Sequence, residues 1–86
     1  MHSIQLEPKD IKQLSISLKK IIGQLQTLTD QINDKKINDQ TFTQLLAAKG
    51  GISRVCKDII SKGILSNLSE YTTEELDQAL TIILKL

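Results

Sequence analysis

A stripe of apolar side chains between positions 11 and 32 limits what this chain can fold into more than any other feature. Its members are three and four residues apart, the spacing that places side chains on one face of an α-helix. They are Ile11, Leu14, Leu18, Ile21, Ile22, Leu25, Leu28 and Ile32. Pro8 suits a first helical turn and polar residues follow at 33–36, so we expect a helix over about residues 8–33. Such a helix would be about 39 Å long, which is too long for a chain of 86 residues to cover without a second long helix and a partner chain.

The same spacing continues after a polar break and predicts a second long helix over about residues 39–64. Asn38 or Asp39 can cap its N-terminus. Gly50 and Gly51 lie in its middle, where each costs about 1 kcal/mol relative to alanine. The glycine pair therefore indicates either a close helix crossing or a local kink.

A third, shorter helix is predicted over about residues 73–85, after a turn. Thr72 and Glu75 have the spacing of a capping box, in which each side chain bonds the backbone of the other. The sequence thus predicts an all-α protomer with two long antiparallel helices and a short C-terminal helix, in one domain over residues 1–86.

The composition argues against several classes of protein. No apolar run reaches the roughly 18 to 20 residues of a membrane-spanning helix, and the N-terminus has neither a basic leader nor an apolar signal core. We therefore expect a cytoplasmic protein without membrane contact. Ser and Cys nucleophiles lack a nearby base and no glycine-rich phosphate loop is present, so we expect neither an enzyme nor a bound cofactor.

The single cysteine and the single histidine each allow two interpretations. Cys56 lies on the apolar stripe of the second helix, where a thiol usually acts as a small hydrophobic group; the alternative is a redox or metal role. His2 lies in a segment that we expect to be flexible, and could instead hold a divalent metal together with the terminal amine. Neither residue belongs to a cluster suited to a closed zinc site.

Basic side chains are concentrated in the first two helices. Residues 1–64 carry ten basic and six acidic groups, whereas residues 65–86 carry one basic and four acidic groups. Lys19 and Lys20 lie in the first helix, and Lys49 and Arg54 lie in the second. On one face, such residues would neutralise DNA phosphates; the alternative is an ordinary solvated surface.

Three segments carry a more specific pattern: Leu18–Gln24, then Gln44 through Val55, then Glu74–Asp77. Their order and spacing resemble the copper-sensing operon repressor family (CsoR/RcnR/FrmR types), which also holds nickel/cobalt, formaldehyde and persulfide sensors. The resemblance spans about residues 8–84. It implies a dimer with a four-helix core, two dimers in a tetramer, and repression through double-stranded operator DNA. The family's basic positions correspond to Lys19, Lys20, Lys49 and Arg54, with one further basic position falling on Ser17.

The resemblance also identifies where family members bind their inducer. The first cysteine of the family falls on Asn38, its second-helix histidine on Gly63 and its second cysteine on Asn67. These residues supply neither thiolate nor imidazole, so we expect no metal site of the family type and no thiol for aldehyde or persulfide sensing.

The leading hypothesis is therefore a DNA-binding transcriptional repressor without the family's sensing site. One alternative is a helical oligomeric protein that modulates a related regulator subunit without binding DNA itself. Another is a sensor whose site has moved to His2 or Cys56.

Overall fold

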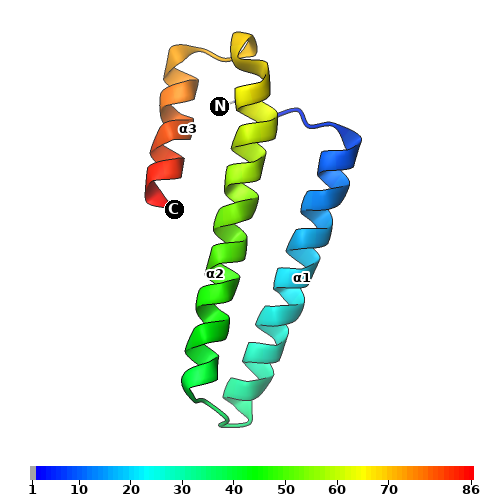
Figure 1. Ribbon diagram of the computed structural model, residues 1–86, viewed down its shortest axis with the longest axis vertical. Helices are drawn as coiled ribbons and strands as arrows, with labels where there is room; N and C mark the ends of the chain where they lie inside the picture. Colours follow the sequence, from blue (N-terminus) through cyan, green and yellow to red (C-terminus); the bar gives the residue numbers. More distant parts are fainter. Residues whose placement is uncertain (1) are drawn as a thin grey trace.

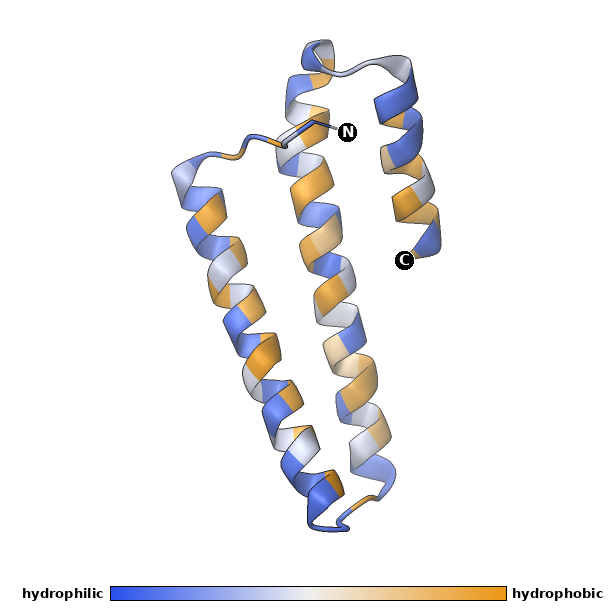
Figure 2. Cartoon of the chain, turned by 180° about the vertical axis from the view of Figure 1, so that it is seen from behind, coloured by the Kyte–Doolittle hydropathy of each residue, from blue (hydrophilic) through white to orange (hydrophobic). Residues whose placement is uncertain are grey.

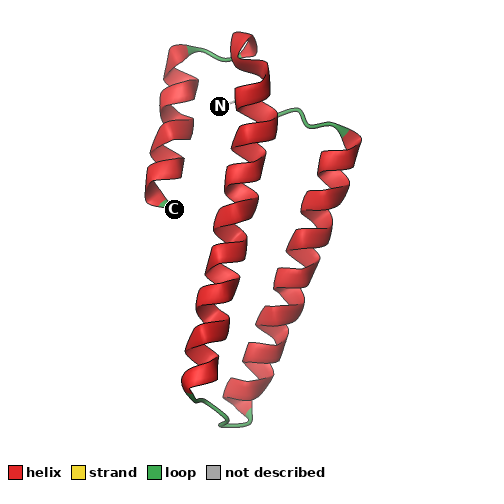
Figure 3. Cartoon of the chain, in the orientation of Figure 1, coloured by secondary structure: helices red, strands yellow, loops and turns green. Residues whose placement is uncertain are grey.

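Three α-helices dominate the computed structural model, which describes residues 2–86. They are α1 (Pro8–Asn33), α2 (Asp39–Ile59) and α3 (Thr73–Lys85). The long helices α1 and α2 form an antiparallel hairpin, and α3 lies beside the C-terminal end of α2 (Figure 1). No strand occurs in the described chain (Figure 3). The predicted all-α class with two long helices and one short helix is confirmed.

The second helix changes its winding where the sequence predicted a continuous α-helix. After Ile59, the chain continues through a π-helical turn, η1 (Ile60–Ile64), and a 3-10 segment, η2 (Leu65–Glu70). A π-helical turn places one more residue in each turn than an α-helix and changes the direction of the side chains that follow it. This change occurs at the end of α2 that contacts α3.

Helix starts follow the predicted signals. Pro8 occupies the first turn of α1. Asn38 caps α2: its side-chain oxygen accepts from the Gln40 backbone N–H at 2.8 Å. Thr72 and Glu75 form the predicted capping box at α3, with bonds of 3.0 and 3.1 Å. These bonds satisfy backbone donors that the first turn of a helix leaves free.

The α1–α2 hairpin buries a narrow seam with a spacing of seven residues. The buried residues are Leu14, Ile21 and Leu28 on α1, and Thr41, Ala48 and Val55 on α2. Gly51 lies beside this seam, where an added Cβ atom would be 3.2 Å from Cδ1 of Ile21. The predicted close crossing is confirmed at this glycine. A Cβ atom at Gly50 would meet open space, and α2 passes through both glycines without a break.

Much of the predicted apolar stripe remains exposed. Its exposed members on α1 are Ile11, Leu18, Ile22, Leu25 and Ile32, and α2 adds Phe42, Leu45, Leu46 and Ile52. Figure 2 shows hydrophobic residues along the whole length of both long helices. The radius of gyration is 16.2 Å, whereas a compact domain of this length has about 12 Å. A single chain therefore leaves one side of its apolar stripe uncovered.

A second core joins α3 to the end of α2. Its buried residues are Ile60, Ile64, Tyr71 and Ala79. Residues 2–7, which we call the strap, cross the end of α2 toward α3 (Figures 1 and 2). Ile4 of the strap packs on this second core, and Leu6 packs on the seam cluster. In residues 2–86, no helix combines the length and hydropathy that crossing a membrane requires.

Candidate nucleic-acid interface

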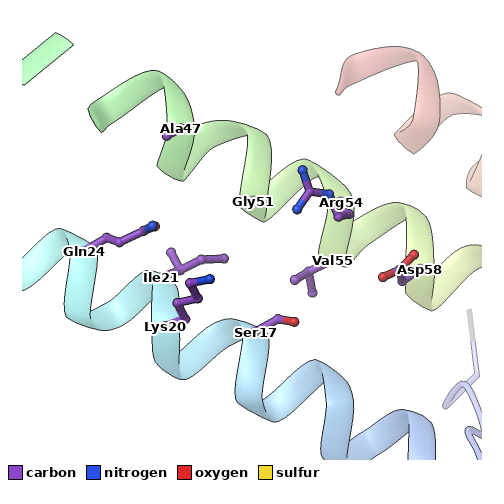
Figure 4. A pocket seen from close by; sticks show the side chains of 9 residues that line it. All are labelled: Ser17, Lys20, Ile21, Gln24, Ala47, Gly51, Arg54, Val55 and Asp58. Atoms are coloured by element: carbon purple, nitrogen blue, oxygen red, sulfur yellow. The ribbon is translucent and has the colours of Figure 1, made fainter. Parts of the chain in front are cut away.

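A groove of about 200 Å³ runs between α1 and α2 along one side of the seam (Figure 4). Residues from both helices line it. They are Ser17, Lys20, Ile21 and Gln24 on α1, and Ala47, Gly51, Arg54, Val55 and Asp58 on α2. Residues three, four and seven apart share one face of an α-helix, so the residues of each wall project from one side of their helix. The methyl group of Ala47 and the absence of a side chain at Gly51 leave the space open on the α2 side.

Lys20 and Arg54 provide the positive charge of this groove. They lie on opposite walls (Figure 4), and both residues are exposed. The ion pairs of the described chain join other residues, namely His2 with Glu75, Lys9 with Glu7, and Lys62 with Asp10. The two groove cations are therefore available to an anion such as a phosphate group.

Lys19 and Lys49 do not line the groove. Each residue advances an α-helix by about 100°, which turns Lys19 away from Lys20. Lys49 is about 140° from Arg54 around α2, on the side that carries the exposed apolar residues Leu45 and Ile52. Of the four basic residues predicted to bind DNA, the structure brings together one from each helix.

Asp58 is a groove residue that the sequence reasoning missed. It lies one turn after Arg54 on α2 and lines the same groove. Its spacing of four from Arg54 was the available signal, because residues four apart are neighbours on a helix surface. Ser17 lies across the groove on α1, at the position where the family resemblance implies a basic residue. Asp58 lowers the net positive charge of the groove, and Ser17 adds no charge to it.

The three predicted inducer positions are not brought together within one chain. Asn38 caps the start of α2, whereas Gly63 lies 25 residues later, about 37 Å along the helix. The Asn67 side chain donates to the backbone oxygen of Gly63 at 3.1 Å. No group of three or more His, Cys, Asp or Glu residues within 2–86 is placed to hold a metal ion. The donor set at these positions does not fit a copper, nickel or zinc ion.

Gly63 is covered by the strap. A Cβ atom added there would collide with Cγ2 of Ile4 and come within 3.2 Å of Cδ2 of Leu6. The conformation of the strap thus requires glycine at a position where the family resemblance places a histidine.

His2, in the segment that we expected to be flexible, contacts Glu75 and Tyr71. Its Nδ1 atom lies 2.7 Å from a carboxylate oxygen of Glu75, and its ring stacks on Tyr71 with 4.7 Å between ring centroids. The pKa of Glu75 is lowered, chiefly because the carboxylate accepts the Thr72 backbone N–H and secondly because of His2. Cys56 is a partly buried free thiol beside Val55.

A family model described as "Metal-sensitive transcriptional repressor" matches residues 10–85. Neither a curated protein nor a solved structure matches the chain. The matched residues include both walls of the groove and positions 38, 63 and 67. They begin after the strap.

Proposed function

The chain belongs to the family of metal-sensitive transcriptional repressors, and from this we propose that it is a DNA-binding repressor that has lost the metal and thiol sensing of the family. The family comprises transcriptional repressors rather than enzymes, in agreement with the composition. The proposal goes further than the family in two respects: it assigns a DNA-contacting groove, and it excludes the family's inducer chemistry at positions 38, 63 and 67.

One observation carries the proposal. Lys20 and Arg54 face one groove from two different helices, and neither is neutralised by an ion pair with another described residue. A DNA phosphate between them would accept charge-assisted hydrogen bonds from both sides. Lys19, on the adjacent outer side of α1, would add to the attraction at longer range. Lys49 is assigned a weaker role because of its position on the apolar side of α2.

Self-assembly is the second part of the proposal. The exposed residues Leu18 and Leu25 of α1, and Leu45 and Ile52 of α2, lie on one side of the buried seam, and the groove lies on the other. Ile11, Leu18 and Leu25 are seven residues apart, the spacing of an interhelical contact line. A second copy placed on this side would complete a four-helix core and leave both grooves open to DNA. Two such dimers would form the tetramer that the resemblance implies.

Asp58 and Ser17 favour the alternative, in which the chain assembles with a related regulator subunit but does not itself contact DNA. A carboxylate inside the groove repels phosphate, and serine supplies no charge. The alternative predicts an intact oligomer with weak and unselective DNA binding. One titration therefore separates the two functions.

The deciding experiment is fluorescence anisotropy of the purified protein with DNA from upstream of its own gene. A scrambled duplex of the same length is the control, and both titrations are repeated at several salt concentrations. The proposal expects selective binding whose affinity falls steeply with salt, because bound cations release counterions from the DNA. Equal, weak binding to both duplexes would contradict it and support the modulator.

A further inference from the structure

The strap is held at two points by different kinds of contact. Near its start, His2 stacks on Tyr71 and bonds Glu75 through both its ring nitrogen and its backbone N–H, at 2.7 and 3.4 Å. Farther along, Ile4 packs into the core formed by η1, Tyr71 and α3. The His2–Glu75 hydrogen bonds are exposed, whereas the contacts of Ile4 are apolar and largely buried. Together they dock an otherwise irregular segment on two separate elements.

The strap also fits its surface closely. Gly63 is buried beneath Ile4 and Leu6, and even a methyl group at this position would collide with Ile4. Overpacking of this kind displaces neighbouring groups, because protein interiors have few voids. Residue 63 therefore decides whether the strap can dock.

Apart from the strap, α3 is held by Ala79 and by the partly buried Leu76 and Ile83, which pack on the second core. Ala79 is its one buried residue, whereas Leu80, Ile82 and Leu84 are exposed. Its inward side meets the same core that Ile4 completes. Its first turn contains Glu75, the residue that His2 bonds. An element with so few buried contacts opens locally at low cost. The strap supplies a substantial part of the contacts that hold α3.

We propose that the strap is a conformational switch built into the chain: docked over Gly63, it holds α3 in place and maintains the DNA-binding form, and its release frees α3 and weakens DNA binding. The strap thus occupies the surface where the family resemblance places an inducer ligand. The step to DNA affinity rests on the proposed function. Docking of the strap and its hold on α3 do not.

Two substitutions release the strap by different routes. Gly63→Ala places a methyl group under Ile4, and His2→Ala removes the stack and the ring hydrogen bond. Two matched controls leave the contacts intact: Ser3→Ala at an exposed strap position, and Gly23→Ala, where a Cβ atom meets open space. Hydrogen–deuterium exchange of residues 73–85 in the full chain measures the hold on α3. Residues 20–33 serve as an internal reference.

We expect amide exchange in α3 to become about tenfold faster in both release variants, as expected for a lower cost of local opening, and to be unchanged in both controls. DNA affinity, measured by anisotropy, should fall about fivefold or more in the release variants, which corresponds to about 1 kcal/mol. Exchange as slow in both release variants as in the controls would overturn the proposal. Faster exchange in α3 with unchanged DNA affinity would show that the strap does not control DNA binding.

A second release variant and a double variant distinguish release of the strap from failure to fold. His2→Ala changes a side chain that is half exposed, so it tests the strap even where Gly63→Ala fails to fold. The double variant Gly63→Ala with Ile4→Ala should show less than the sum of the two single effects, because the colliding atom is gone. Additive effects would place the strap elsewhere. If the unchanged protein binds no DNA, the proposed function fails, while α3 exchange still decides whether the strap docks.

Discussion

Gly51 on α2 lies against Ile21 on α1, so that a Cβ atom at position 51 would be 3.2 Å from Cδ1 of Ile21. Such a distance is shorter than an ordinary van der Waals contact. The two long helices therefore approach closely beside the groove. The glycine that weakens α2 as an isolated helix thus allows the close approach of α1 beside Lys20 and Arg54.

A larger side chain at this contact should force the helices apart. We expect Gly51→Val to lower the free energy of unfolding by about 1 to 3 kcal/mol, the usual cost of overpacking, in urea titrations followed by circular dichroism. Gly50→Ala is the matched control, because its Cβ atom meets open space in the chain and alanine favours the helix. A Gly51→Val protein as stable as the control would show that α1 and α2 do not approach closely here.

Charge changes in the groove should alter DNA binding in both directions. Lys20→Ala and Arg54→Ala should each weaken binding to all duplexes and reduce the slope of log affinity against log salt by about 0.9 per lost phosphate contact. Asp58→Asn should strengthen binding, because it removes a negative charge from the same groove. Lys85→Ala, on α3, is the charge-matched control. Equal effects at Lys20 and Lys85 would refute the assignment of the groove.

Acid should remove a contribution that Glu75 makes to stability. Because the fold lowers the pKa of this carboxyl, the ionised form stabilises the folded state. That stabilisation is complete above the pKa of the unfolded chain and is lost as the pH falls through the lowered folded pKa. We expect the difference in Tm between the unchanged protein and Glu75→Gln to be largest at neutral pH and to shrink in acid. Glu74→Gln, in the same helical turn, should show a smaller difference at neutral pH.

Asn38 should matter for folding rather than for sensing. Its side chain caps α2, so Asn38→Ala is expected to cost about 1 kcal/mol of stability, whereas Asn38→Asp retains a capping oxygen and should cost much less. Thermal unfolding measures both variants. Equilibrium dialysis of the unchanged protein against Cu(I), Ni(II) and Zn(II) should show no tight binding. A Kd below about 1 μM would indicate a metal site elsewhere in the protein.

The exposed apolar residues beside the seam should form the surface on which copies of the chain assemble. Leu18→Glu or Ile52→Glu would bury a charge in that contact and should convert the oligomer to monomers in sedimentation experiments. Gln13→Glu introduces the same charge at an exposed polar position of α1 and should leave the oligomer intact. An oligomer unaffected by either apolar substitution would place the contact on another face.

Sequence reasoning captured the all-α class because each helix carries its own local signal. The apolar spacing of α1, the Asn38 cap and the Thr72–Glu75 box act within a few residues, so each can be recognised without knowledge of the rest. Assignment of the groove was less complete. Helix geometry alone gives the angle between Lys19 and Lys20 and the angle between Lys49 and Arg54. These angles could have shown that Lys19 and Lys49 point away from the face that carries Lys20 and Arg54.

The strap could not be predicted for the opposite reason. His2 and Ile4 are too few to form a periodic pattern, and their partners Tyr71, Glu75 and Gly63 lie about 60 to 70 residues later. Only the folded chain shows that they meet. The π-helical turn at Ile60 likewise has no local sequence signal of its own.

The closure of Ile4 over Gly63 has an evolutionary consequence. In an ancestor with a histidine at position 63, the present path of the strap would have been sterically forbidden, since even a methyl group collides there. A reversal that restored the imidazole by one substitution would therefore unseat the strap before any ligand set was complete. The order of substitutions matters: the strap must first move or shrink, and two further ligands must follow. No single substitution at position 63 can therefore restore the family's ligand set while the strap keeps its present path.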